Sequence, residues 1–191
     1  MSRGFFVIVE GQIVLGLSEG KNTMCPIGKN PSTGLEVFAL HAESLPAAAA
    51  KLSPSTRRFT ALIACDSDQL AVEEIGEFAV GLMEQGGIYV CCWGNGCERF
   101  HYIIDKIWVA REMDGKCGAV TNNSTLMTTW HNDESLDEAL WFLLSCAWPL
   151  DDEMESCSTI AITIGNESWE NNVVNRLENM EQFQNEISDT N

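Results

Sequence analysis

The sequence predicts an α/β protein with a four-stranded, mostly parallel, Rossmann-like sheet flanked by helices. Apolar or β-branched runs alternate with helical stretches after about residue 58, which is typical of parallel strands joined by right-handed helical crossovers. Each run is nearly continuous, as strands buried on both faces of a sheet require. The predicted strands are 59–65, 87–93, 125–130 and 158–164.

Helical periodicity and start signals agree with this alternation. The predicted helices are 71–85, 97–112, 136–147 and 168–187. Ser135 followed by Glu138 is the pattern of a capping box, in which the two residues satisfy free backbone N–H groups at a helix start. In the last helix, Val173, Leu177 and Met180 recur with helical spacing, so one face of this helix is expected to pack against the sheet or another chain.

The first 57 residues differ in pattern from the rest. Two apolar runs within 4–17 are parted by Glu10-Gly11, which predicts a β-hairpin, and 35–40 predicts a further strand. A polar break at 53–58 follows. We therefore predict an N-terminal β-rich subdomain (1–57), an α/β domain (58–167) and a C-terminal amphipathic helix with a tail (168–191).

The charge of the chain limits its partners. The 191 residues carry a formal net charge of -17, and nucleic-acid binding depends on Lys and Arg, so no nucleic-acid partner is expected. A basic protein partner is favoured instead, although the charge also serves solubility. No apolar run approaches the roughly 20 residues that a membrane-spanning helix needs, so no membrane partner is expected.

The cysteines favour a reducing compartment. Several of the eight lie inside apolar runs, where a free thiol behaves as a small buried hydrophobe, and the N-terminal stretch lacks the features of a signal peptide. We therefore expect a cytoplasmic protein.

Polar residues follow all four predicted strands, where parallel sheets gather their ligands. Asp66 and Asp68 after the first strand, with Glu167 after the last, form a candidate set of metal ligands for Mg²⁺. His131 and Asp133 after the third strand, together with Asp66, are candidate catalytic residues, a base with carboxylates. The alternative role of the aspartates is helix capping, and that of the histidine is a hydrogen-bonded structural residue.

A wider set of residues near these strand ends forms a candidate binding surface. It consists of Trp93, Cys97, Trp130, His131 and Glu134. Cys97 stands at a predicted helix start, where the helix dipole lowers a thiol pKa. Helix capping accounts for the acidic residues after the third strand, but it gives no local reason for Trp130 and His131.

Two segments resemble a known family. WGNGCER at 93–99 and MTTWHNDESLDEALWF at 127–142 are similar to two blocks of an uncharacterised bacterial domain family, a domain of unknown function, over about residues 58–165. The resemblance implies an autonomous α/β domain and carries no activity with it.

Two functions remain open from the sequence. The first is a non-catalytic, immunity- or inhibitor-like module that binds a basic protein and needs no cofactor. The second is a metal-assisted hydrolase or phosphotransferase that uses Mg²⁺ on a small phosphorylated or nucleotide substrate. We favour the first, because sites that act on phosphates usually also supply Lys or Arg, and only the strand end near Arg99 does so.

Overall fold

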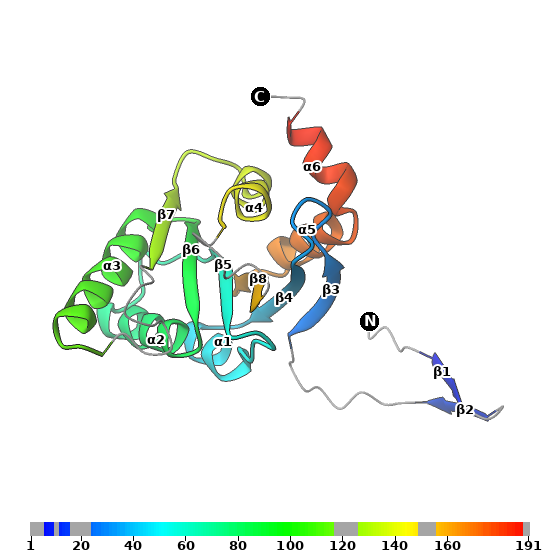
Figure 1. Cartoon of the computed structure of the whole chain (residues 1–191), viewed down its shortest axis with the longest axis horizontal. Coiled ribbons are helices and arrows are strands. Elements are labelled where there is room, and N and C mark those ends of the chain that lie inside the picture. The colour runs from blue at the N-terminus through cyan, green and yellow to red at the C-terminus, as the bar shows by residue number, and fades with distance from the viewer. Residues whose placement is uncertain (1–5, 10–11, 16–23, 117–125, 149–155, 189–191) are drawn as a thin grey trace.

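Six strands form one mixed sheet in the part of the chain that the structure describes. This computed structural model describes residues 24–116, 126–148 and 156–188, together with the backbone of 6–9 and 12–15. The strand order is β3-β4-β8-β5-β6-β7, so β3 and β7 lie at opposite edges (Figure 1). The strands are β3 (Cys25–Lys29), β4 (Glu36–Ala42), β5 (Arg58–Ala64), β6 (Gly87–Trp93), β7 (Met127–His131) and β8 (Cys157–Ile164).

The α/β class is confirmed, but the prediction of a four-stranded sheet is wrong. The four predicted strands are β5 to β8, and β4 adds to them by pairing in parallel with β8, while β3 pairs antiparallel with β4. All eight residues of β8 are buried, and β4 and β5 flank it on its two sides. Because β4 comes from the segment before residue 57, where the sequence predicts a boundary, the sheet continues across that position.

Helices cover both faces of the sheet. One face carries α1 (Leu45–Lys51), α2 (Val72–Glu84) and α3 (Cys97–Met113), and the other carries α4 (Leu136–Ser145), α5 (Glu167–Glu178) and α6 (Met180–Ser188). Each face has its own hydrophobic core, and alternate side chains of the central strands contribute to one or the other. The result is a three-layer arrangement with the sheet in the middle (Figure 1).

The predicted helix 168–187 is two helices. α5 ends at Glu178 and α6 begins at Met180, with Asn179 between them. Val173, Leu177 and Met180 are buried, as their spacing predicts, and Phe183 of α6 joins them in the same core.

The predicted hairpin is present as β1 (Phe6–Val9) paired antiparallel with β2 (Gln12–Leu15). Among the described helices, none is long and apolar enough to cross a membrane.

The crossover pattern fixes where a ligand crevice can form. β8 lies between β4 and β5 in the sheet. The helices after β4 and β5 lie on one face of the sheet, whereas the helix after β8 lies on the other, so the segments that follow these neighbouring strands leave the sheet in opposite directions. Open α/β sheets bind ligands at such positions, beyond the carboxyl ends of the strands.

Candidate functional site

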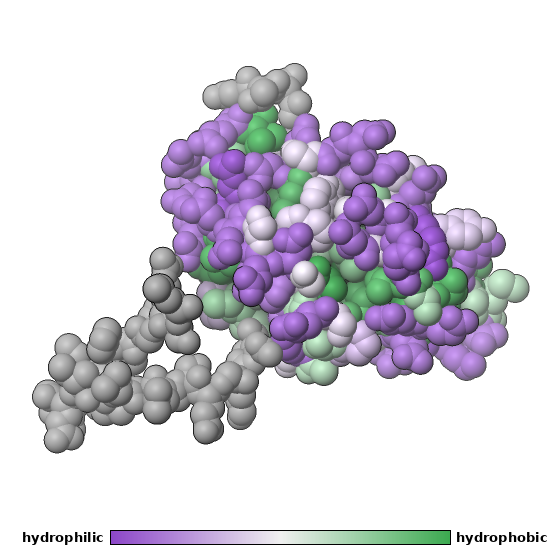
Figure 2. Space-filling view, turned by 180° about the vertical axis from the view of Figure 1, so that it is seen from behind, coloured by the Kyte–Doolittle hydropathy of each residue, from purple (hydrophilic) through white to green (hydrophobic). Residues whose placement is uncertain are grey.

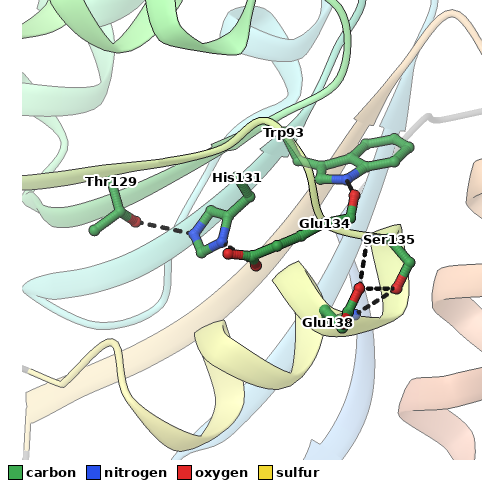
Figure 3. A network of polar contacts seen from close by, with 6 residues as sticks. All are labelled: Trp93, Thr129, His131, Glu134, Ser135 and Glu138. Atoms are coloured by element: carbon green, nitrogen blue, oxygen red, sulfur yellow. Dashed lines mark hydrogen bonds and ion pairs between the residues drawn. The ribbon is translucent and has the colours of Figure 1, made fainter.

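His131, the last residue of β7, is held inside the protein at the joint between β7 and α4. The residue is 3% exposed. Its Nδ1 lies 2.7 Å from Oε2 of Glu134, and its Nε2 lies 3.1 Å from Oγ1 of Thr129 (Figure 3). The ring also meets the Phe142 ring edge-on, with centroids 4.9 Å apart. Both ring nitrogens thus have partners within the protein, and the imidazole ties β7 to the start of α4.

Trp93, the last residue of β6, is held against the same joint. Its indole Nε1 donates to the backbone carbonyl of Glu134 at 2.8 Å (Figure 3). Its ring also packs edge-on against Trp169 of α5, with centroids 5.1 Å apart. Three of the predicted binding residues, Trp93, His131 and Glu134, therefore come together, because Glu134 bonds Trp93 through its backbone and His131 through its side chain.

The start of α4 has the predicted capping box. Oγ of Ser135 accepts from the backbone N–H of Glu138 at 3.2 Å, and the backbone N–H of Ser135 donates to Oε2 of Glu138 at 2.7 Å (Figure 3). The Ser135 hydroxyl also donates to Oε2 of Glu138 at 2.7 Å, and the two hydrogen bonds that this carboxylate accepts, from the backbone N–H and from the hydroxyl of Ser135, lower its pKa. The neighbouring Asp133 is exposed. The capping box thus starts α4 through contacts between neighbouring residues, and His131 additionally links β7 to α4 through its contact with Phe142.

Trp130 faces the opposite side of the sheet from His131, since successive side chains of a strand alternate. Its ring stacks on His101 of α3, with centroids 4.6 Å apart and planes inclined by 31°. Nδ1 of His101 lies 2.7 Å from Oγ1 of Thr128, which in turn donates to Oδ1 of Asp105 at 2.5 Å. Trp130 is nevertheless 48% exposed.

Asp66 and Asp68 organise the loops after β5 and β6. Oδ1 of Asp66 accepts from the backbone N–H of Asn95 at 3.1 Å and from its Nδ2 at 3.0 Å. Asp68 lies so close to Gly96 that a Cβ built there would be 2.4 Å from Oδ1 of Asp68, and Gly96 has a positive φ of 76°. Arg99 then locks the loop by donating to the carbonyls of Ser67 and Leu70, each at 2.9 Å.

The Cys97 thiol is not activated as its helix-start position suggests. The side chain is 1% exposed, and burial raises its pKa, although backbone hydrogen bonds act in the opposite direction. Desolvation therefore outweighs the helix start. Cys97 is a buried neutral thiol at neutral pH and does not lie on an open surface.

A pocket of about 230 Å³ opens at the predicted crevice, beyond the ends of β4, β5 and β8. Three carboxylates and an indole contribute to its wall. The lining residues are Glu43, Ser44, Leu45, Cys65, Asp66, Leu70, Glu74, Ile164, Gly165, Asn166 and Trp169. Of the candidate site residues named from the sequence, Asp66 alone lines this pocket; His131, Asp133, Asp68 and Glu167 do not.

No group of three His, Cys, Asp or Glu side chains positioned to hold a metal ion occurs in the part of the chain that the structure describes. Asp66, Asp68 and Glu167 therefore do not form such a set, although all three follow strands of one sheet. The carboxyl ends of parallel strands bring the backbones of the following loops together, but the direction of each side chain depends on the conformation of its own loop.

The sequence reasoning missed several residues of these sites. Glu43 lines the pocket because β4 belongs to the main sheet, and grouping the run 35–40 with the other strands would have revealed it. Glu74 and Trp169 lie in the first turns of α2 and α5, beyond the residues that directly follow the strands. His101 of α3 is the partner that gives Trp130 its position, and no pattern in the sequence marks it.

Comparison with known proteins identifies a family whose function is unknown. A family model described as a domain of unknown function, DUF7684, matches residues 36–180. The match agrees with the resemblance to an uncharacterised domain family and extends beyond 58–165 to include β4, α1 and α5. No curated protein matches the chain.

Proposed function

The chain belongs to this domain family of unknown function, and we propose that it is a non-catalytic module that binds a basic protein partner through its acidic rim. We define the acidic rim as the carboxylates in the segments that follow the parallel strands and in the first turns of the next helices. Its twelve members are Glu43, Asp66, Asp68, Glu73, Glu74, Glu98, Asp133, Glu134, Asp137, Glu138, Glu167 and Glu170.

The observation that carries the proposal is the near absence of compensating charge in this rim. Arg99 is the one Lys or Arg within the same segments, and its guanidinium donates to two backbone carbonyls. Within the described residues, Asp137 is the one rim carboxylate that pairs with an arginine, Arg176 of α5 at 2.6 Å. Helix dipoles stabilise carboxylates in first turns, which explains how the fold tolerates the accumulation.

The state of the candidate catalytic residues supports binding over catalysis. His131 is buried with both nitrogens bonded, and one carboxylate oxygen of Asp66 is engaged by Asn95. A general base needs a free nitrogen or oxygen within reach of its substrate. A rim of carboxylates also repels phosphates, so a nucleic-acid partner is again disfavoured.

The described cysteines support a cytoplasmic location for the module. All seven are free thiols, and five of them are buried. Disulfides persist mainly in oxidising compartments, whereas buried free thiols are common in the cytosol.

One observation favours the second function, a metal-assisted hydrolase or phosphotransferase that uses Mg²⁺ on a small phosphorylated or nucleotide substrate. The pocket with Glu43, Asp66 and Glu74 stands where α/β enzymes bind their substrates. Its lining contains no Lys or Arg to receive a phosphate, which is why we rank this function second.

A charge-reversal comparison tests the binding proposal. The probe is an oligolysine peptide at low ionic strength, titrated against the full chain. Glu73→Lys with Glu98→Lys alters two exposed rim residues, and Glu36→Lys with Glu112→Lys makes the same change of net charge outside the rim. We expect the rim variant to bind about tenfold more weakly than the control variant, a difference of about 1.4 kcal/mol. Equal weakening in both variants would show attraction to net charge alone and would contradict the proposal.

The second function has its own test. A bound metal raises the melting temperature of the folded protein by mass action. A clear rise with Mg²⁺ or Mn²⁺ that disappears in Asp66→Asn would favour the metal-assisted enzyme over the binding module.

A further inference from the structure

The two edges of the sheet are built differently. β3 contains Pro26 and Lys29, and its pairing with β4 shifts register between Pro26 and Gly28. Proline, lysine and a bulge are the usual devices that prevent an edge strand from pairing with another chain. β7, with the sequence Met-Thr-Thr-Trp-His, has none of them.

β7 is open within the described residues. Its backbone pairs with β6 on one side, and the described part of the chain places no strand on the other side (Figure 1). Met127 and Trp130 of β7 are 40% and 48% exposed, and Tyr102 of the adjacent α3 is 58% exposed. Figure 2 shows hydrophobic residues at the surface on the side of the molecule where α3 lies, between hydrophilic areas.

Trp130 is fixed in place although it is exposed. One face of the indole rests on His101, which is held through Thr128 and Asp105. A large aromatic side chain with a fixed orientation loses little conformational entropy when a partner covers it, and tryptophan is enriched among the residues that dominate binding energy. The polar network thus prepares the exposed part of the indole for contact.

The charges around β7 select the kind of partner. Asp105 lies beside the strand, Asp133 and Glu134 follow its carboxyl end, and the Nζ of Lys106 lies 5.0 Å from the centroid of the Tyr102 ring, so the carboxylates are in excess. A second copy of the chain would bring the same carboxylates and a net charge of -17 to the interface. An extended segment with basic side chains complements these charges.

We infer that β7 is the docking edge for an extended, basic segment of the partner protein, which adds to the sheet as a further strand. Backbone hydrogen bonds to β7 provide the pairing, and alternate side chains of the segment provide specificity, as in other cases of strand addition. Its apolar side chains contact Trp130 and Met127, and its basic side chains face Asp105 and the carboxylates after His131. The inference rests on the proposed function for the charge of the partner.

NMR titration of the ¹⁵N-labelled full chain tests the inference. The probe is a short peptide in which lysine and valine alternate, and its control is a peptide in which glutamate replaces lysine. We expect the lysine peptide to shift the amide signals of Met127–His131 and to slow their hydrogen exchange at least about tenfold, since pairing protects edge amides. The glutamate peptide should leave both unchanged.

Two exposed apolar residues provide a matched pair of variants. Trp130→Lys places a charge on the edge, and Trp148→Lys makes the same substitution after α4 and outside the acidic rim, where Trp148 is 43% exposed. Trp130→Lys should weaken peptide binding at least about tenfold, as expected for a dominant interface residue, while Trp148→Lys should change it little. Met127→Lys repeats the test in case Trp130→Lys unfolds the protein.

Several outcomes would overturn the inference, and they are distinct from failure of the proposed function. Shifts confined to the acidic rim would remove β7 as the docking edge and leave the basic-partner proposal standing. Protection of the β7 amides in the free monomer would mean that the chain covers its own edge. A dimer that Trp130→Lys dissociates would identify a second copy as the occupant. No binding of any lysine peptide would count against both proposals.

Discussion

At the scale of single residues, two neighbours in β7 have different functions because they point to opposite faces. His131 is buried between Thr129, Glu134 and Phe142, whereas Trp130 is half exposed on His101. The capping box that explains Ser135 says nothing about either of them. Thr129 and Glu134 lie within three residues of His131, but the ring partners of the two residues come from positions 101 and 142, which no local rule connects with the joint.

The burial of His131 predicts a large loss of stability on truncation. The sequence predicts that the histidine lies at an open crevice, in which case His131→Ala should lower the free energy of unfolding by less than about 2 kcal/mol. From the structure we expect about 3 kcal/mol, because the change leaves a cavity beside Phe142 and removes the ring that partners Glu134 and Thr129. Urea unfolding measures the difference, and Asn132→Ala at the next, exposed position is the control. A cost equal to that of the control would mean that the imidazole is not a structural tie.

The cysteines differ in their expected reactivity. Cys25 and Cys146 are exposed, although partial desolvation also raises the pKa of Cys146. Cys65, Cys91 and Cys97 are buried, and burial raises the pKa of the first two to about 12 and also raises that of Cys97. Thiolates react and thiols do not, so a maleimide reagent at neutral pH should label Cys25 and Cys146 well before the buried residues. Mass spectrometry of the labelled native protein identifies the sites. Rapid labelling of Cys97 would contradict its buried position.

At the scale of elements, local signals set the starts of helices, and tertiary contacts set their ends and partners. Ser135 caps α4, and Asn166 caps α5 by accepting from the backbone N–H groups of Ser168 and Trp169. No Pro or Gly marks the break between α5 and α6 at Asn179, so the hydrophobic periodicity predicts a single helix over 168–187. Packing of Phe183 into the α4–α5 side of the core accompanies the change of direction.

The capping box predicts a modest, local effect. Ser135→Ala removes the side-chain acceptor for the Glu138 N–H and should lower the free energy of unfolding by about 1 kcal/mol. Binding at β7 should persist. The backbone N–H of Ser135, which the variant keeps, and the Ser135 hydroxyl, which it loses, both donate to the Glu138 carboxylate and lower its pKa. The contribution of the hydroxyl bond is present above the unfolded-state pKa and is lost as pH falls through the lower folded-state pKa. The difference between wild type and variant should therefore shrink in acid, which denaturant unfolding at several pH values measures. A difference that grew in acid would contradict this account of the cap.

At the scale of the whole molecule, the fold separates its titratable groups by environment. Carboxylates collect on the rim at the carboxyl ends of the strands, while thiols are buried in β6, at the end of β5 and at the start of β8. Ionisation of the buried groups is coupled to folding, whereas the proposed function assigns the charge of the rim groups to contact with a partner.

The buried thiols predict a loss of stability in alkali. Burial raises the pKa of Cys91 to about 12 and that of Cys157 to about 11, above the ordinary value of 9.0. A raised folded-state pKa means that stability is fully present below pH 9 and is lost as pH rises toward the folded-state values, by up to about 1.4 kcal/mol per pH unit for each thiol. Cys91→Ala should reduce this slope, and Cys25→Ala at an exposed site should not. Equal slopes in wild type and Cys91→Ala, measured by urea unfolding, would exclude Cys91 as a source.

The sequence by itself determined the α/β class, the strands β5 to β8, the helix starts and the acidic character of the strand-end loops. Each of these depends on contacts within about one turn or on runs of consecutive apolar residues, which the order of residues records directly. Tertiary structure decided that β4 pairs with β8, so that Glu43 meets Asp66 at the pocket, and that His101 supports Trp130. It also decided that Cys97 is buried and that His131 is a tie. These depend on pairings between distant segments, for which many arrangements satisfy the same local pattern and only the packing of the whole core selects one.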